Sequence, residues 1–99
     1  MILKKATIIT ARYSSSRYPG KILENITNKL KSIDILIKRA KKIELPIILA
    51  TSSNPDDDKL CNYVKKNYDI IIFRGSKKDK IKRWYDCFYK FKIHRACMV

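Results

Sequence analysis

The feature that most limits how this chain can fold is a repeated switch between two hydrophobic periods. Short apolar runs rich in β-branched residues alternate with longer segments in which apolar residues recur every three or four positions. The expected strands are residues 5–11, 45–51, 69–75 and 95–99, with helices in the intervals between them. Strands that alternate with helices favour a parallel sheet with right-handed crossovers. We therefore predict one Rossmann-like, three-layer α/β/α domain over residues 1–99.

Each expected helix has a candidate apolar face. The face of the first helix, which begins near residue 30, consists of Leu30, Ile33, Ile37 and Ala40. The face of the second consists of Leu60, Cys61, Val64 and Tyr68. The third helix spans residues 78–91, and its predicted face consists of Ile81, Trp84, Tyr85 and Phe88. At helical spacing these aromatic residues indicate core packing rather than a surface that stacks bases.

A run of three acids, Asp56 to Asp58, follows the second expected strand. Ser53 or Asn54 suits a helix N-cap, and Pro55 suits the first helical position. The acids then fall in the first helical turn, where the helix dipole favours negative charge. Because consecutive helical residues point in different directions, we interpret the run as a helix start and not as a metal cluster.

The charge balance leaves two interpretations open. The chain carries 23 Lys and Arg against nine acids, a formal net charge of +14. Such a balance suits an anionic partner, but scattered lysines also arise from a general Lys and Ile bias. No apolar stretch is long enough to cross a bilayer, and the basic residues near the N-terminus do not have the order of a signal peptide.

The cysteines indicate a reducing compartment. Cys61, Cys87 and Cys97 are widely spaced and odd in number, and the single His94 cannot complete a zinc set with them. We predict reduced thiols that serve as small core residues in a cytoplasmic protein.

The stretch "TARYSSSRYPGK" follows the first expected strand and has the groups that bind phosphate. Arg12 and Arg17 offer planar forks, Lys21 offers a point charge, Ser15 offers a hydroxyl, and Gly20 permits close backbone approach. Ligands of parallel α/β sheets bind where strands end at their carboxyl edge, and this loop leaves that edge. The spacing is not that of a Walker A loop. From the residues alone, a phosphate site and a solvated loop both remain open.

Three segments together resemble one family. "IITARYSSSRYPGK" resembles the signature loop of the sugar cytidylyltransferases, roughly A-R-x-x-S-x-R-x-P-G-K. "ILATSSNPDDD" and "FRGSKKDKIKRWYDCF" resemble that family's second and third strands with the segments after them. The likeness is to the enzymes that activate Kdo and acylneuraminates with CTP, and most of all to their spore-coat polysaccharide branch. It covers nearly the whole chain.

The resemblance implies a nucleotide-diphospho-sugar transferase fold and transfer of CMP from CTP to a sugar, with release of pyrophosphate. The residues that it places in the nucleotide site are Ala11, Arg12, Ser15, Arg17, Gly20, Lys21, Arg74, Gly75 and Ser76. Among them, the cations of the first loop would hold the triphosphate. Ala11 and the residues at positions 74–76 would lie near cytosine and ribose. No catalytic residue is assigned.

The resemblance also sets expectations for cofactor and partners. It implies Mg²⁺, bound by an Asp-rich motif that the family carries after the fourth strand and thus beyond Val99. We accordingly expect this chain to be the N-terminal, nucleotide-binding half, without the sugar-binding half. The expected partners are CTP, a sugar, and a second copy or another chain, with no membrane and no nucleic acid.

Two departures from the family pattern stand out. Thr10 replaces the usual Pro or Gln, and Lys77, Lys78 and Lys80 make the third loop more basic.

The alternative function is a non-catalytic module that binds a nucleotide or a polyanion. A nucleic-acid-binding protein is a weaker third candidate, because the arginines cluster in one loop and form no stripe.

Overall fold

The computed structural model describes residues 2–11, 21–23 and 30–99, and for Lys21 only the backbone. Its centre is a four-stranded sheet in the order β3-β2-β1-β4. The strands are β1 (Lys4–Thr10), β2 (Ile47–Ser52), β3 (Ile71–Gly75) and β4 (Ile93–Met98). All three pairings are parallel, with Ile8 opposite Ile48 on one side of β1 and Met98 on the other. The predicted α/β fold is confirmed, and the strand boundaries lie within two residues of their predictions.

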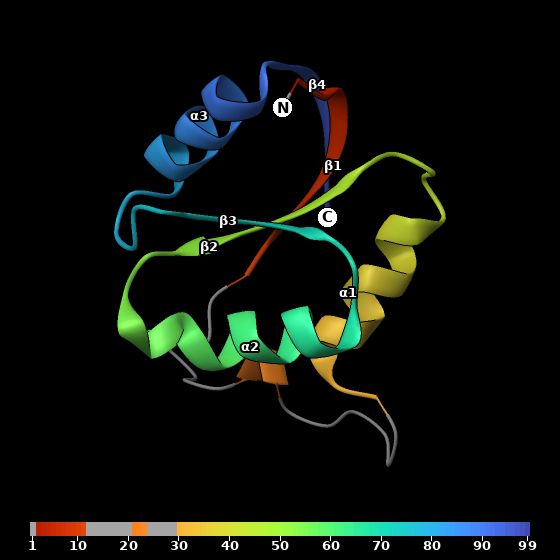
Figure 1. The fold of residues 1–99 in the computed structure, drawn as a ribbon, viewed down its shortest axis with the longest axis vertical. Coiled ribbons are helices and arrows are strands. Elements are labelled where there is room, and N and C mark those ends of the chain that lie inside the picture. Colours follow the sequence, from red (N-terminus) through yellow and green to blue (C-terminus); the bar gives the residue numbers. More distant parts are fainter. Residues whose placement is uncertain (1, 12–20, 24–29) are drawn as a thin grey trace.

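Helices cover both faces of this sheet, as Figure 1 shows. The helices are α1 (Ser32–Lys41), α2 (Asp58–Asn67) and α3 (Lys80–Phe91), and the short 3-10 turns are η1 (Lys21–Leu23) and η2 (Pro55–Asp57). α1 and α2 pack on one face, and α3 packs on the other. This arrangement is the predicted three-layer architecture.

The face under α1 and α2 is built from the predicted apolar stripes. Ile33, Ile37 and Ala40 of α1 are fully buried, and so are Leu60 and Val64 of α2. The same face holds Asp34, a buried carboxylate that accepts hydrogen bonds from the hydroxyls of Tyr63 and Tyr68 and from the Lys31 amide. Asp34 therefore joins the start of α1 to α2 and to the residue that ends α2.

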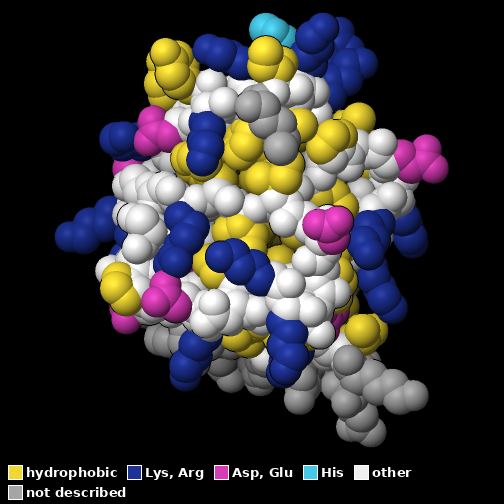
Figure 2. Space-filling model, in the orientation of Figure 1, with side chains coloured by type: hydrophobic (Ala, Val, Ile, Leu, Met, Phe, Trp, Pro, Cys, Tyr) yellow, Lys and Arg dark blue, Asp and Glu magenta, His cyan; other side chains and the backbone are white. Residues whose placement is uncertain are grey.

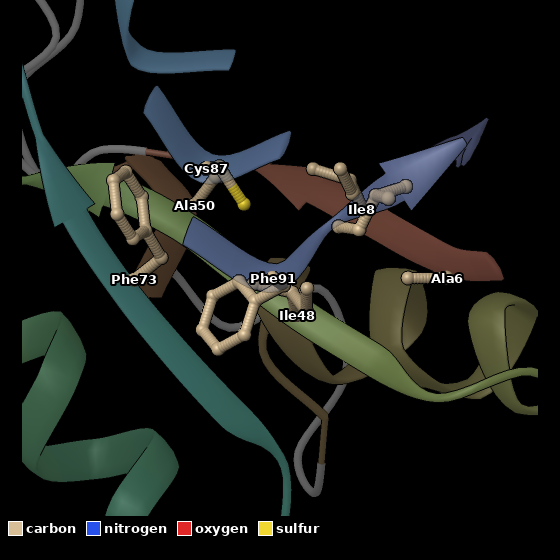
Figure 3. Packing of buried hydrophobic residues seen from close by; sticks show 8 residues of the cluster. Ala6, Ile8, Ile48, Ala50, Phe73, Cys87 and Phe91 are labelled. Atoms are coloured by element: carbon tan, nitrogen blue, oxygen red, sulfur yellow. The ribbon is translucent and has the colours of Figure 1, made fainter. Parts of the chain in front are cut away.

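The opposite face has a compact apolar core, shown in Figure 3. It consists of Ala6, Ile8, Ile48, Ala50, Phe73, Cys87, Phe91 and Ile93. The rings of Phe73 and Phe91 meet edge to face, with centroids 6.3 Å apart. Figure 3 shows Cys87 above the middle of the sheet, so the small side chain lets the helix backbone come close.

The predicted apolar face of α3 is partly wrong. Ile81 and Tyr85 are 74% and 67% exposed, whereas Trp84 and Phe88 are half-buried. The residues that face the sheet are Arg83, Cys87 and Phe91, at a spacing of four. Arg83 packs its stem over Gly75 and donates from Nη1 to the Ser76 carbonyl at 3.1 Å, so an arginine takes a core position that the pattern assigned to an aromatic residue.

α3 ends at Lys92, whose φ of 54° is left-handed, and its amide donates to the carbonyls of Phe88 and Tyr89. β4 begins at the next residue and pairs on one side with β1. Cys97 lies on this strand and is exposed, so the prediction that it is a core residue is wrong. β4 is last in the sheet order, and most of its residues are exposed. No described helix is long and apolar enough to cross a membrane.

Candidate functional site

The site predicted from the sequence lies at the carboxyl edge of the sheet. β1 connects to β2 on one side and pairs with β4 on the other, so the strand order reverses between β1 and β4. Open α/β sheets bind ligands outside the carboxyl ends of the strands at such a reversal. Ala11, which is 7% exposed, continues β1 there and donates its amide to the Ala50 carbonyl at 3.3 Å. Val99 extends β4 beside it and donates its amide to the Ile8 carbonyl at 3.0 Å.

Most of the predicted phosphate loop lies outside the described residues. This holds for Arg12, Ser15, Arg17 and Gly20, and for the side chain of Lys21. Described residues flank the loop on both sides: Ala11 follows β1, and Lys21 opens η1. Ile22 and Leu23 of η1 pack against the core under α1 and α2.

Arg74 forms the densest polar contact at this edge. Its Nε donates to the Ser52 carbonyl at 2.7 Å, and its Nη2 donates to the Asn54 carbonyl at 2.8 Å. Its Nη1 lies 2.8 Å from Oδ1 of Asp58. Each guanidinium nitrogen thus holds part of the segment that joins β2 to α2. Arg74 lies at the predicted edge, and its contacts brace two neighbouring loops.

The three consecutive acids have three different partners. Asp57 is fully buried and accepts a hydrogen bond from the Ser52 hydroxyl. Asp58 pairs with Arg74, and Asp56 lies 3.4 Å from Nζ of Lys77. Asn54 caps η2 by accepting from the Asp56 amide, as predicted for this residue or Ser53. Among the described residues no three His, Cys, Asp or Glu side chains converge as metal ligands.

Gly75 and Ser76 connect β3 to α3. The Gly75 carbonyl accepts from the Ser53 amide at 2.9 Å. A Cβ at position 75 would lie 2.9 Å from Cε2 of Phe73 and 3.1 Å from Cγ of Arg83, so only glycine lets α3 pack this closely. The Ser76 hydroxyl accepts from the Asp79 amide, and Asp79 in turn caps α3 by accepting from the Lys82 amide. These contacts fix the segment after β3 beside the segment after β2.

One contact at this edge was not expected from the sequence. Nε1 of Trp84 donates to Oγ1 of Thr10 at 2.7 Å, and Nζ of Lys80 lies 4.9 Å from the centroid of the Trp84 ring. Two sequence features draw attention to these residues: the departure from the family pattern at Thr10 and the added lysines of the third loop. Neither signal indicates a partner 74 positions away.

The two buried cysteines do not have the character of nucleophiles. Burial raises the pKa of Cys87 to about 11, and burial also raises the pKa of Cys61. Both therefore stay protonated near neutral pH, and the thiolate is the reactive form. Their place in the structure is the core.

A family model described as cytidylyltransferase matches residues 6–99. The chain belongs to this cytidylyltransferase family. A cytidylyltransferase from Leptospira borgpetersenii serovar Hardjo-bovis has a similar solved structure, with a TM-score of 0.81 and 29% identity. That similarity covers 97% of this chain and 41% of the Leptospira chain. The expected fold and membership in the cytidylyltransferase family are thereby confirmed, whereas the sugar substrate and the spore-coat branch stay predictions.

A second relative is an uncharacterized protein of Methanocaldococcus jannaschii, 35% identical over 89 residues. The alignment covers 85% of this cytidylyltransferase chain and 35% of the archaeal protein. This chain therefore spans well under half the length of either relative.

Proposed function

We propose that this cytidylyltransferase chain binds CTP at the carboxyl edge of its sheet, as the nucleotide half of an enzyme that transfers CMP to a sugar. The observation that carries the proposal is the place where β1 ends. The carboxyl end of β1 lies at the strand-order reversal, and the signature loop follows it in the sequence, within a family match that covers residues 6–99. Arg12, Arg17 and Lys21 hold the triphosphate in this proposal. Ala11, Arg74, Gly75 and Ser76 border cytosine and ribose.

The proposed reaction is an in-line displacement. A sugar hydroxyl attacks the α-phosphorus, the new P–O bond forms, and the bond to the bridging oxygen breaks with release of pyrophosphate. Catalysis of this kind depends on positioning and charge neutralisation. The contribution of this chain is to orient the triphosphate and neutralise its charge. The sugar site, the surface-polysaccharide context and a cytoplasmic location are parts of the same proposal.

Magnesium belongs to the proposal through the family resemblance alone. The three consecutive acids do not fit a metal site, because Asp57 bonds to Ser52 and Asp58 to Arg74 while Asp56 faces Lys77. A sugar and a second copy of the chain are the further proposed partners.

Calorimetric titration of CTP into the chain tests the proposal, with Arg17→Ala and Lys41→Ala as matched variants. A charge-assisted hydrogen bond to phosphate is worth roughly 1.5–3 kcal/mol, so Arg17→Ala should weaken CTP binding about tenfold or more. Nζ of Lys41 lies over the Tyr68 ring near the end of α1, and its loss should change CTP binding little. Absence of CTP binding to the wild type contradicts the proposal.

The alternative is a nucleotide- or polyanion-binding module without catalysis. On the face drawn in Figure 2, Lys and Arg side chains are scattered among other residues and form no continuous stripe. On this face, the distribution is not that of a nucleic-acid track. Equal loss of affinity in Arg17→Ala and Lys41→Ala would instead indicate a diffuse positive field.

A further inference from the structure

The hydrogen bond between Trp84 and Thr10 fixes the point where β1 ends. Thr10 is the last residue of the strand, and Ala11 follows it at the carboxyl edge. The Thr10 side chain lies on the α3 face, since it alternates in phase with Ala6 and Ile8 of the core under α3. The indole N–H, which is part-buried, reaches its hydroxyl at 2.7 Å. This contact ties α3 to the residue that precedes the signature loop.

Lys80 adds a charge at the same place. It is the first residue of α3, is exposed, and holds its Nζ 4.9 Å from the centroid of the Trp84 ring. Among the other cations of this edge, Arg74 pairs with Asp58 and Lys77 pairs with Asp56. No ion pair of the described residues involves Lys80. Its charge is therefore not neutralised by a carboxylate of that part of the chain.

We propose that Trp84 and Lys80 are a further part of the nucleotide site, which α3 contributes. Trp84 is a positioning residue: through Thr10 it sets the end of β1 and so the start of the loop that holds the triphosphate. Lys80 is a phosphate-contacting residue that the Trp84 ring holds near the end of β1. A lysine serves phosphate as a point charge, and preset geometry lowers the ordering cost of binding. The inference rests on the proposed CTP binding.

Trp84 itself provides the first measurement, because it is the only tryptophan of the chain. CTP titrated into the wild type should change the Trp84 emission, with a midpoint equal to the dissociation constant from calorimetry. Unchanged emission at CTP concentrations that saturate the calorimetric signal would place the nucleotide away from Trp84 and overturn the inference.

Calorimetry on variants separates the two roles. Lys80→Ala should weaken CTP binding about three- to tenfold and make it less sensitive to salt. Lys90→Ala is the matched control, because its Nζ also lies over aromatic rings, those of Phe73 and Phe91, but near the other end of α3. It should bind CTP like the wild type. Loss of affinity in Lys90→Ala equal to that in Lys80→Ala would overturn the assigned role of Lys80.

Trp84→Phe and Thr10→Val each remove one partner of the hydrogen bond. Both should weaken CTP binding by a similar factor of about five, at a temperature where thermal melts show each variant folded. The double variant should bind no more weakly than either single variant, because the two side chains act as one unit. Additive losses would contradict the positioning role.

These experiments distinguish failure of the proposed function from failure of the roles assigned to Trp84 and Lys80. If the wild type does not bind CTP, the proposed function is wrong and this inference is overturned with it. If the wild type binds CTP and the variants at positions 10, 80 and 84 all bind it equally well, the proposed function stands and the inference is wrong.

Discussion

The two faces of the sheet are covered in different ways. Under α1 and α2, the apolar core surrounds a polar centre in which Asp34 links two tyrosines and a backbone amide. Under α3, a single helix fills its face with Phe91 and Cys87 against the strands. Two helices on one face need a contact that fixes them to each other as well as to the sheet. A single helix needs only close packing on the strands, and Gly75 provides the room for it.

The largest expected effect comes from the α3 face. Phe91→Ala should lower the free energy of unfolding by about 3–5 kcal/mol, because it removes a buried ring and its edge-to-face contact with Phe73. Chemical denaturation measures this change. Tyr89→Ala is the control on the same helix, since Tyr89 is 69% exposed and should cost well under 1 kcal/mol. Equal losses would show that the exposed side of α3 also carries stability.

Substitution of Asp34, in the polar centre under α1 and α2, should lower the free energy of unfolding less than Phe91→Ala does. The size of this loss should depend on pH. Burial alone would raise the pKa of Asp34, but hydrogen bonds from Tyr68, the Lys31 amide and Tyr63 outweigh it and hold that pKa below its ordinary value. Asp34→Asn should lower the free energy of unfolding by about 2 kcal/mol at neutral pH.

The sign of the pH effect follows from the lowered pKa. The stabilisation by Asp34 is present above its unfolded pKa of about 3.9 and is lost as pH falls through the folded value. Denaturation at a series of pH values should show a loss below about pH 4 in the wild type that is smaller in Asp34→Asn. Parallel curves would mean that Asp34 does not contribute through its charge.

A smaller change, an increase in the free energy of unfolding, is expected for a substitution in the face under α1 and α2. Oγ1 of Thr7 is buried and has no hydrogen-bond partner in the described part of the chain. Thr7→Val keeps the shape of the side chain and removes this hydroxyl, which should raise the free energy of unfolding by about 1 kcal/mol. The hydroxyl of Thr51, on the neighbouring strand β2, is also buried and has no hydrogen-bond partner in the described part of the chain. Thr51→Val therefore tests the same effect. A loss in both variants would indicate partners for these hydroxyls.

The smallest effect is expected at the end of α3. Lys92 has a left-handed backbone, which glycine adopts without strain. Lys92→Gly should be more stable than Lys92→Ala by roughly 0.5 kcal/mol, because the strain relieved slightly exceeds the extra entropy of unfolded glycine. Thermal melts of the two variants isolate the backbone term, since both lack the lysine contact with the Tyr89 ring. The opposite order would show that Ala is accommodated without strain.

The difference between the faces also explains what the sequence could predict. Alternating periods were enough for the strands and for α1 and α2, because Ile33, Ile37, Leu60 and Val64 follow the helical period and are buried. α3 has apolar residues on two adjacent sides, so the pattern alone did not decide which side faces the sheet. Phe73 and Gly75 decide it by admitting Arg83 and Cys87 at close range.

Some features of the candidate site could likewise be predicted from the sequence, and others could not. Its place at the carboxyl edge followed from the predicted topology, and its family followed from local motifs that a sequence displays directly. The bracing contacts of Arg74 and the bond from Trp84 to Thr10 join residues 16 to 74 positions apart. Such pairings are set by tertiary packing, and no local pattern encodes them.

The place of β1 between β2 and β4 has a consequence for how the chain folds. Lys4 lies opposite Ile93, so the first strand completes its pairing only when the last strand arrives. Contacts between residues so far apart in sequence carry a high loop-closure cost and slow folding. During synthesis, β1 would have an open edge until residues 93–98 leave the ribosome. Until then, that edge can pair with strands of other chains.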